Sequence, residues 1–225
     1  ISASTSTLLS GVLDQSIEGL NLRTGTLREE LASEASPSLL VFLRHAGCIF
    51  CRETVADLRD ASLQDPSLPR PLFVFQGSVD DAARLIGRIW PAASVITDRS
   101  KRLYEGVGVP RGSWGEMFGP SVWACGVRAT AKGHRVGAPK GDPWTLPVVL
   151  LLDAAGTILW RHEPRHAGDH PCWTSLPENA RPQPPSSSAL TSPRPASSDS
   201  STEPSSSGAS PDGSASTRHT SGARS

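Results

Sequence analysis

Two cysteines separated by two residues, Cys48 and Cys51, form the clearest chemical motif of the chain. The apolar run before them, at residues 39–43, predicts a short buried strand, and the spacing of Val55 and Leu58 predicts a helix over residues 48–62. A cysteine at a helix N-terminus faces unpaired backbone N–H groups and the positive end of the helix dipole, which both favour the thiolate. The motif therefore predicts a redox-active pair that closes a small disulfide reversibly.

Charged residues surround the motif. Arg44, His45 and Arg52 flank the two cysteines and would add positive potential wherever they point toward them. The apolar positions of the predicted helix leave its charged side chains for solvent, namely Arg52, Glu53, Asp57 and Arg59. Arg44 and His45 are accordingly candidate neighbours of the active site.

Two other interpretations of the motif stay open. Cys-x-x-Cys is half of a zinc site, although the chain has no second copy of it, and two buried inert cysteines are the remaining alternative. A second metal-like pattern is the run of His162, His166, His170 and Cys172, which Pro164, Gly168 and Pro171 keep from forming one continuous helix. We expect redox chemistry with no bound metal and no cofactor.

The charge balance, the apolar runs and the cysteine content exclude several classes of protein. The chain has 225 residues, with 22 Lys and Arg against 22 Asp and Glu, so nothing indicates a nucleic-acid partner. No apolar run is long enough to cross a bilayer. The two further cysteines, Cys125 and Cys172, lie far apart, which is typical of a thiol protein and favours an intracellular soluble compartment. The chain begins at Ile1 rather than Met, so targeting stays open, as does the oligomeric state.

Composition divides the chain into three parts. We expect an N-terminal extension at residues 1–26, one α/β domain at 27–176, and a disordered Ser/Pro-rich tail at 177–225. The predicted strands are 39–43, 72–76, 94–98, 146–153 and 157–162, and the last two form a hairpin around residues 154–156. The predicted helices are 27–33 with Thr26 as its cap, 48–62, 79–90, a turn at 101–104, and 116–132. Alternation of strands and helices predicts a parallel sheet, with mixed pairing where the hairpin joins it.

The long segment at residues 106–143 interrupts this pattern. We favour a packing insert over a lid or a partner-docking insert, and expect its apolar side chains to lie on the domain: Trp114, Met117, Phe118, Val122, Trp123 and Cys125.

The whole pattern resembles the thioredoxin fold. Six segments are similar to the peroxiredoxin-like proteins of the alkyl hydroperoxide reductase/thiol-specific antioxidant superfamily, including the selenoprotein L-like group. They are residues 42–53 (FLRHAGCIFCRE), 111–115 (RGSWG), 122–126 (VWACG), 132–137 (KGHRVG), 141–144 (GDPW) and 165–170 (RHAGDH). Together they extend over most of residues 37–171.

This resemblance implies thiol redox chemistry, with Cys48 as the attacking cysteine, Cys51 as the resolving cysteine and Pro147 as the cis-proline beside their disulfide. It also implies a peroxide or disulfide substrate and an external thiol reductant of the thioredoxin or glutathione type. The chain departs from the family pattern at Ile49, where a Cys-Pro-x-Cys motif has proline, and at His45, where a typical peroxiredoxin has Thr or Ser. A disulfide reductase without peroxidase activity and a non-enzymatic binding module therefore remain alternatives.

Overall fold

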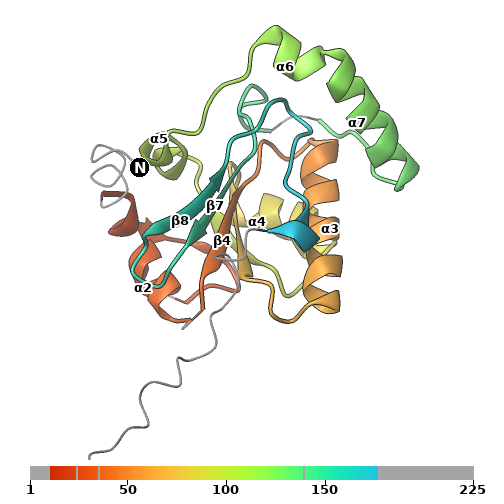
Figure 1. Cartoon of the computed structure of the whole chain (residues 1–225). Coiled ribbons are helices and arrows are strands. Elements are labelled where there is room, and N and C mark those ends of the chain that lie inside the picture. Colours follow the sequence, from red (N-terminus) through yellow and green to blue (C-terminus); the bar gives the residue numbers. More distant parts are fainter. Residues whose placement is uncertain (1–10, 24, 35, 139, 177–225) are drawn as a thin grey trace, which may run out of the picture. The chain divides into compact units, whose positions relative to one another are not determined.

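A six-stranded mixed sheet forms the centre of the computed structural model, which describes residues 11–23, 25–34, 36–138 and 140–176 (Figure 1). Its strand order is β2-β6-β5-β4-β7-β8. The bounds are β2 Gly19–Leu20, β4 Ser38–Phe42, β5 Arg70–Phe75, β6 Ser94–Thr97, β7 Val148–Leu152 and β8 Ile158–His162. The sheet confirms all five predicted strands, with ends that differ by a few residues.

The central strands explain why the sequence there is apolar without a break. β4 pairs parallel with β5 and antiparallel with β7, and every residue of β4 and β7 is buried. Alternate residues face opposite sides of a strand. Leu39 and Val41 belong to one hydrophobic cluster, and Leu40 and Phe42 belong to the other. Because both faces of the sheet are covered, continuous apolar strands are what the fold requires.

Helices cover the two faces of the sheet. Helix α3 (Ile49–Gln64) and the short α4 (Val79–Ala82) pack on one face, while α2 (Leu27–Ala32) and α5 (Arg102–Val107) pack on the other (Figure 1). The capping box at Thr26 is present, so this predicted helix start is confirmed. Among the described residues, every helix is too short or too polar to cross a membrane.

The N-terminal residues also join the sheet. β2 pairs antiparallel with β6 at its edge, and β1 (Ser16–Ile17) pairs with β3 (Gly25–Thr26). The predicted domain boundaries stay a prediction, and the predicted tail at residues 177–225 lies outside the described residues.

The C-terminal hairpin is confirmed. The carboxylate of Asp153 accepts hydrogen bonds from the backbone N–H groups of Ala155 and Thr157, at 2.9 and 2.7 Å. Gly156 has a positive φ of 82°, a conformation that glycine adopts without strain. Beyond β8 the chain returns toward α3 and ends its described part in a 3₁₀ turn at Trp173–Ser175.

Two predicted helices differ from the structure. The helix predicted at 79–90 is α4 followed by a π-helical turn at Ala83–Gly87. The helix predicted at 116–132 is two helices, α6 (Trp114–Phe118) and α7 (Pro120–Ala131). The break falls at Gly119 because Pro120 has no N–H and its ring favours the first position of a new helix.

The packing predicted for the insert is partly wrong. Met117 and Val122 are buried, but Trp114, Phe118 and Trp123 are 73%, 59% and 72% exposed. Helices α6 and α7 extend past one end of the sheet instead of lying flat on it (Figure 1). Their exposed aromatic side chains therefore face outward beside that end, where the cysteine motif also lies.

These elements together form the predicted mixed α/β fold of the thioredoxin-like class. Three parallel strands lie beside an antiparallel hairpin, and the Cys-x-x-Cys helix follows the central strand β4.

Candidate redox site

Cys48 is the N-cap residue of helix α3. Its Sγ accepts the backbone N–H of Cys51 at 3.3 Å, one of the N–H groups that a helix start leaves unpaired. The Cys48 N–H in turn donates to the carbonyl oxygen of His45 at 3.1 Å, which closes the turn between β4 and α3. Both cysteines are free thiols and are 3% exposed. The helix start thus places the Cys48 sulfur where backbone donors stabilise negative charge.

Arg44 brings a positive charge to the same sulfur. Its side chain is buried, and Nη1 lies 3.5 Å from the Cys48 Sγ. The guanidinium is held in place because Nε donates to the carbonyl oxygen of Thr145 at 2.8 Å and Nη2 donates to that of Pro143. These carbonyls come from the segment just before β7, about a hundred residues further along the chain, so only the folded structure orients Arg44.

The two thiols of the pair have different acidities. Burial opposes ionisation of Cys48, but the hydrogen bond from Cys51 and the Arg44 guanidinium outweigh it and lower the pKa of Cys48 to about 6. Burial, followed by the hydrogen bond to Cys48, raises the pKa of Cys51 well above its ordinary value. Cys48 is thus the thiolate of the pair at neutral pH, and Cys51 keeps its proton.

His45 lies beside the cysteines without a charge. Its side chain is 9% exposed, and its Nδ1 has no hydrogen-bond partner. Burial, followed by repulsion from Arg44, lowers the pKa of His45 to about 4. His45 therefore cannot act as a cationic partner of Cys48 at neutral pH, but its ring can exchange a hydrogen bond with a bound molecule.

The neutral state of His45 can be checked directly. We expect the NMR signals of its ring carbons to stay constant between about pH 5.5 and 8, whereas an exposed histidine titrates near 6.5 in that window. A His45→Gln variant assigns the resonance. A midpoint above pH 6 for His45 would contradict the buried neutral ring.

A large apolar groove opens beside Cys48. Its volume is about 820 Å³, within the range of small-molecule sites. Arg44, His45 and Cys48 lie at its polar end. Its walls come from the α3 start, from α6 and α7, and from the segment after α7, and their apolar side chains are Ile49, Phe50, Met117, Phe118, Val122, Trp123, Val127 and Val136. The thiolate thus lies at the end of a cleft suited to apolar groups.

Aromatic side chains continue the apolar surface at the base of α6. Trp114 packs edge-on against Trp144 with ring centroids 4.9 Å apart, and Phe118 lies 6.2 Å from the same ring. These contacts tie α6 to the segment before β7, which also supplies the carbonyls that hold Arg44.

Pro147 lines a small cavity together with Arg44, Phe50 and Cys51. Its predicted cis peptide bond and its predicted catalytic role stay predictions.

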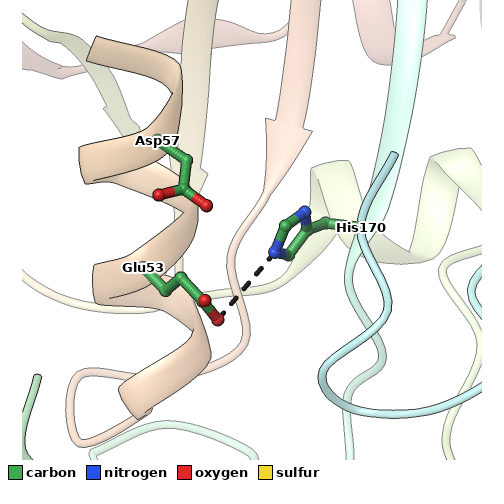
Figure 2. Close-up of side chains that lie close together, drawn as sticks. All are labelled: Glu53, Asp57 and His170. Carbon is green, nitrogen blue, oxygen red and sulfur yellow. Dashed lines mark ion pairs between the residues drawn. The ribbon is translucent and has the colours of Figure 1, made fainter. Parts of the chain in front are cut away.

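Other candidates from the sequence are distributed differently. Arg52 is not among the residues that line the groove. Cys125 is half-buried on α7, with its Sγ 3.5 Å from Arg128, and Cys172 is exposed. The run of histidines does not gather: His162 lies 3.9 Å from Asp169, while His170 faces helix α3 (Figure 2).

Glu53 is the residue that sequence reasoning placed wrongly. It was expected to face solvent, yet it is 0% exposed. Helix α7 and the segment that holds His170 cover Glu53. The spacing of apolar residues along α3 does not indicate that these two segments pack there. The one available signal is on α7 and just after it, where Arg128 and Lys132 stand four residues apart and so share a helix face.

Glu53, Asp57 and His170 also form the one group, within the described part of the chain, whose side-chain atoms lie as close together as metal ligands do (Figure 2). A lysine already occupies the position between the two carboxylates. The Nζ of Lys132 lies 3.0 Å from Glu53 and 2.8 Å from Asp57. The carboxylates are therefore neutralised by protein cations, and we assign no metal to them.

Comparison with known proteins gives one family match and several structural likenesses. A family model described as AhpC/TSA antioxidant enzyme matches residues 58–166, a stretch that begins after Cys51. No curated protein matches the chain. The resemblance predicted from the sequence is confirmed as a similarity: residues 58–166 are similar to this antioxidant family.

Among solved structures, peroxiredoxin Q of Xanthomonas campestris has a TM-score of 0.48 at 14% identity, covering 68% of this chain and 82% of its own. A secreted Mycobacterium tuberculosis disulfide oxidoreductase homologous to E. coli DsbE has a TM-score of 0.44 at 14% identity, covering 70% and 89%. Peroxidoxin BcpB from Mycobacterium tuberculosis has a TM-score of 0.43 at 14% identity, covering 61% and 74%.

Proposed function

We propose that the protein is a thiol-dependent oxidoreductase in which Cys48 attacks a peroxide or a disulfide and Cys51 resolves the product. The observation that carries this proposal is the position of the Cys48 sulfur. It accepts the Cys51 N–H at 3.3 Å, lies 3.5 Å from the Arg44 guanidinium, and opens to a groove. These contacts favour the nucleophilic thiolate in a place that a substrate can reach.

With a peroxide, the Cys48 thiolate attacks one peroxide oxygen and the O–O bond breaks. A Cys48 sulfenic acid forms, and the leaving oxygen takes up a proton as an alcohol or water. The Cys51 thiol then attacks the Cys48 sulfur, so that the S–S bond forms and water leaves. An external dithiol or two external thiols, of the thioredoxin or glutathione type, reduce the disulfide and complete a two-electron cycle.

The groove favours a substrate with an apolar part. Hydrogen peroxide occupies a small fraction of about 820 Å³, and most of the lining is apolar. An organic hydroperoxide would place its reactive group at Cys48 and its carbon skeleton between α3 and α7. His45 is positioned at the same end of the groove and offers a neutral ring for a hydrogen bond to the substrate oxygen.

Disulfide reduction is the second candidate, and the position of Pro147 favours it. Pro147 lines a small cavity with Cys51, and this supports the role that the resemblance implies for it beside the disulfide. In this reaction Cys48 attacks a substrate sulfur, a mixed disulfide forms, and one substrate thiolate leaves. Cys51 then releases the second substrate thiol.

Stopped-flow oxidation of the reduced protein separates these reactions. Loss of thiols is followed with hydrogen peroxide, with cumene hydroperoxide and with a small disulfide, for wild type and Cys48→Ser. Peroxidase chemistry predicts Cys48-dependent loss of two thiols with a hydroperoxide, and faster reaction with the apolar one. Reaction with the disulfide alone would establish the reductase instead. If no reagent distinguishes wild type from Cys48→Ser, the protein is a non-enzymatic binding module and our proposal fails.

A further inference from the structure

A buried carboxylate links the cysteine helix to the wall of the groove. Glu53 lies on α3, two residues after Cys51, and is fully buried. Its Oε1 accepts from Nε of Arg128 at 2.7 Å, and its Oε2 accepts from Nη2 of the same guanidinium at 2.9 Å. Such a two-pronged contact restrains both the distance and the relative rotation of the two helices that carry these groups.

Lys132 and His170 complete the contacts of Glu53. Lys132 lies 3.0 Å from Glu53 and also pairs with Asp57, one turn further along α3. His170 approaches the other carboxylate oxygen at 3.9 Å, from the segment after β8 (Figure 2). Although burial raises the pKa of Glu53, contacts with His170, Arg128 and Lys132 hold it well below its ordinary value. The carboxylate is thus charged throughout the physiological range.

Helix α7 has few other attachments to the domain. Of its twelve residues only Val122 and Ala129 are buried, while Trp123 and Val127 are more than two-thirds exposed. Half-buried Cys125 also packs against the core, but these small side chains together contribute little apolar area. The ion pairs of Glu53 are therefore a large part of what holds α7 on α3.

The same helix forms one wall of the groove. Val122, Trp123 and Val127 line it from α7, and Cys48 lies at its end on the α3 side. A shift of α7 relative to α3 changes the width of the groove but leaves the Cys48 contacts in place. Those contacts come from Arg44 and from the backbone of α3 itself.

We propose that Glu53 is a positioning residue that holds α7 against the cysteine helix and so determines which substrates fit beside Cys48. It touches neither the reacting sulfur nor the groove, and it acts through Arg128 and Lys132. The inference rests on the proposed function for the identity of the groove as the substrate site. The attachment of α7 by Glu53 stands independently of any activity.

The first test measures hydrogen exchange of α7 amides in full-length Glu53→Gln. Exchange over residues 120–131 is expected to accelerate at least about tenfold, because removing the buried charge of Glu53 removes the ion pairs that hold α7 on α3 and favours local opening. The matched control is Glu30→Gln. Glu30 is equally buried and pairs with Arg70 at the far end of the sheet, so its loss should leave α7 exchange unchanged. Equal exchange of α7 in wild type and Glu53→Gln would overturn the proposal.

A gentler variant covers the case in which Glu53→Gln does not fold. Lys132→Met removes a half-exposed cation and leaves the Arg128 contact intact. It is expected to accelerate α7 exchange by about threefold, in line with the smaller energy of a partly exposed pair. If Glu53→Gln is unfolded and Lys132→Met exchanges like wild type, the attachment we propose is wrong.

The second measurement concerns substrate choice. Glu53→Gln is expected to raise KM for cumene hydroperoxide at least about fivefold with kcat nearly unchanged, because the groove binds ground state and transition state alike. The rate constant with hydrogen peroxide and the pH midpoint of Cys48 alkylation should stay within twofold and a few tenths of a pH unit of wild type. A parallel fall for both peroxides would contradict a role in substrate choice. A wild type that does not react through Cys48 would instead refute the proposed function and leave the exchange result standing.

Discussion

Cys51→Ser is expected to stop turnover at an oxidised Cys48. Resolution within the pair is intramolecular, and well-placed groups react as though present at effective concentrations far above those of any external thiol. We therefore expect steady-state turnover with a thioredoxin-type reductant to fall by about a hundredfold or more. The first oxidation of Cys48 should change little, because a serine hydroxyl can still donate to its sulfur.

This expectation is tested by measuring the mass of the protein after a single addition of peroxide. Wild type should lose two hydrogen atoms as the disulfide forms, whereas Cys51→Ser should retain a sulfenic acid that dimedone captures. Cys125→Ser and Cys172→Ser are the matched controls, and both should behave as wild type does. If Cys51→Ser turns over normally while Cys125→Ser accumulates the sulfenic acid, Cys125 is the resolving cysteine and our assignment is wrong.

Arg44→Met is expected to move the pH dependence of Cys48 rather than abolish its reactivity. The guanidinium lies 3.5 Å from the sulfur, and loss of such a neighbour raises a thiol pKa by about one to three units. The midpoint of alkylation by iodoacetamide should rise from about 6 in wild type to near 8.

The rates should cross because two effects oppose each other. At pH 6 the variant has about fifty times less thiolate, and a more basic thiolate regains about sixfold to tenfold in nucleophilicity for a shift of two units. We expect Arg44→Met to react about fivefold to eightfold more slowly than wild type at pH 6, nearly equally at pH 7, and faster at pH 9. Wild type is faster only at low pH because its Cys48 has the lower pKa. It carries a larger thiolate fraction than the variant only below the pKa of the variant.

Arg44→Lys is the control for charge. It keeps a cation but not the forked contacts with the carbonyls of Pro143 and Thr145. Its alkylation midpoint should fall between those of wild type and Arg44→Met. A midpoint that stays near 6 in Arg44→Met would show that the helix N-terminus alone activates Cys48.

The local chemistry of this protein could be predicted from its sequence. A strand followed by a helix is predicted by the apolar run before Cys48 and by the spacing of Val55 and Leu58. Both patterns arise from residues that are close together along the chain. Capping at Thr26 and the hairpin around Gly156 are local in the same sense. The Cys-x-x-Cys pair at a helix start therefore needed no tertiary information.

The burial of side chains in the insert could not be predicted from local sequence patterns. Its aromatic residues were expected to be buried, yet Trp114, Phe118 and Trp123 are exposed beside the groove. The apolar character of a side chain does not predict which surface it packs against. It also does not distinguish a core residue from one that lines a binding site.

By itself, then, the sequence determined the strand–helix unit, the position of the cysteine pair at the helix start, and the class of fold. The tertiary structure decided which charges surround them. Arg44 reaches Cys48 only because carbonyls before β7 hold its guanidinium, and Glu53 is buried only because α7 and the segment of His170 close over it. Both depend on contacts between residues at least 75 positions apart, which the periodicity of one helix cannot encode. Burial then determines how strongly each charge interacts with its partners, because electrostatic interactions become stronger as water is excluded.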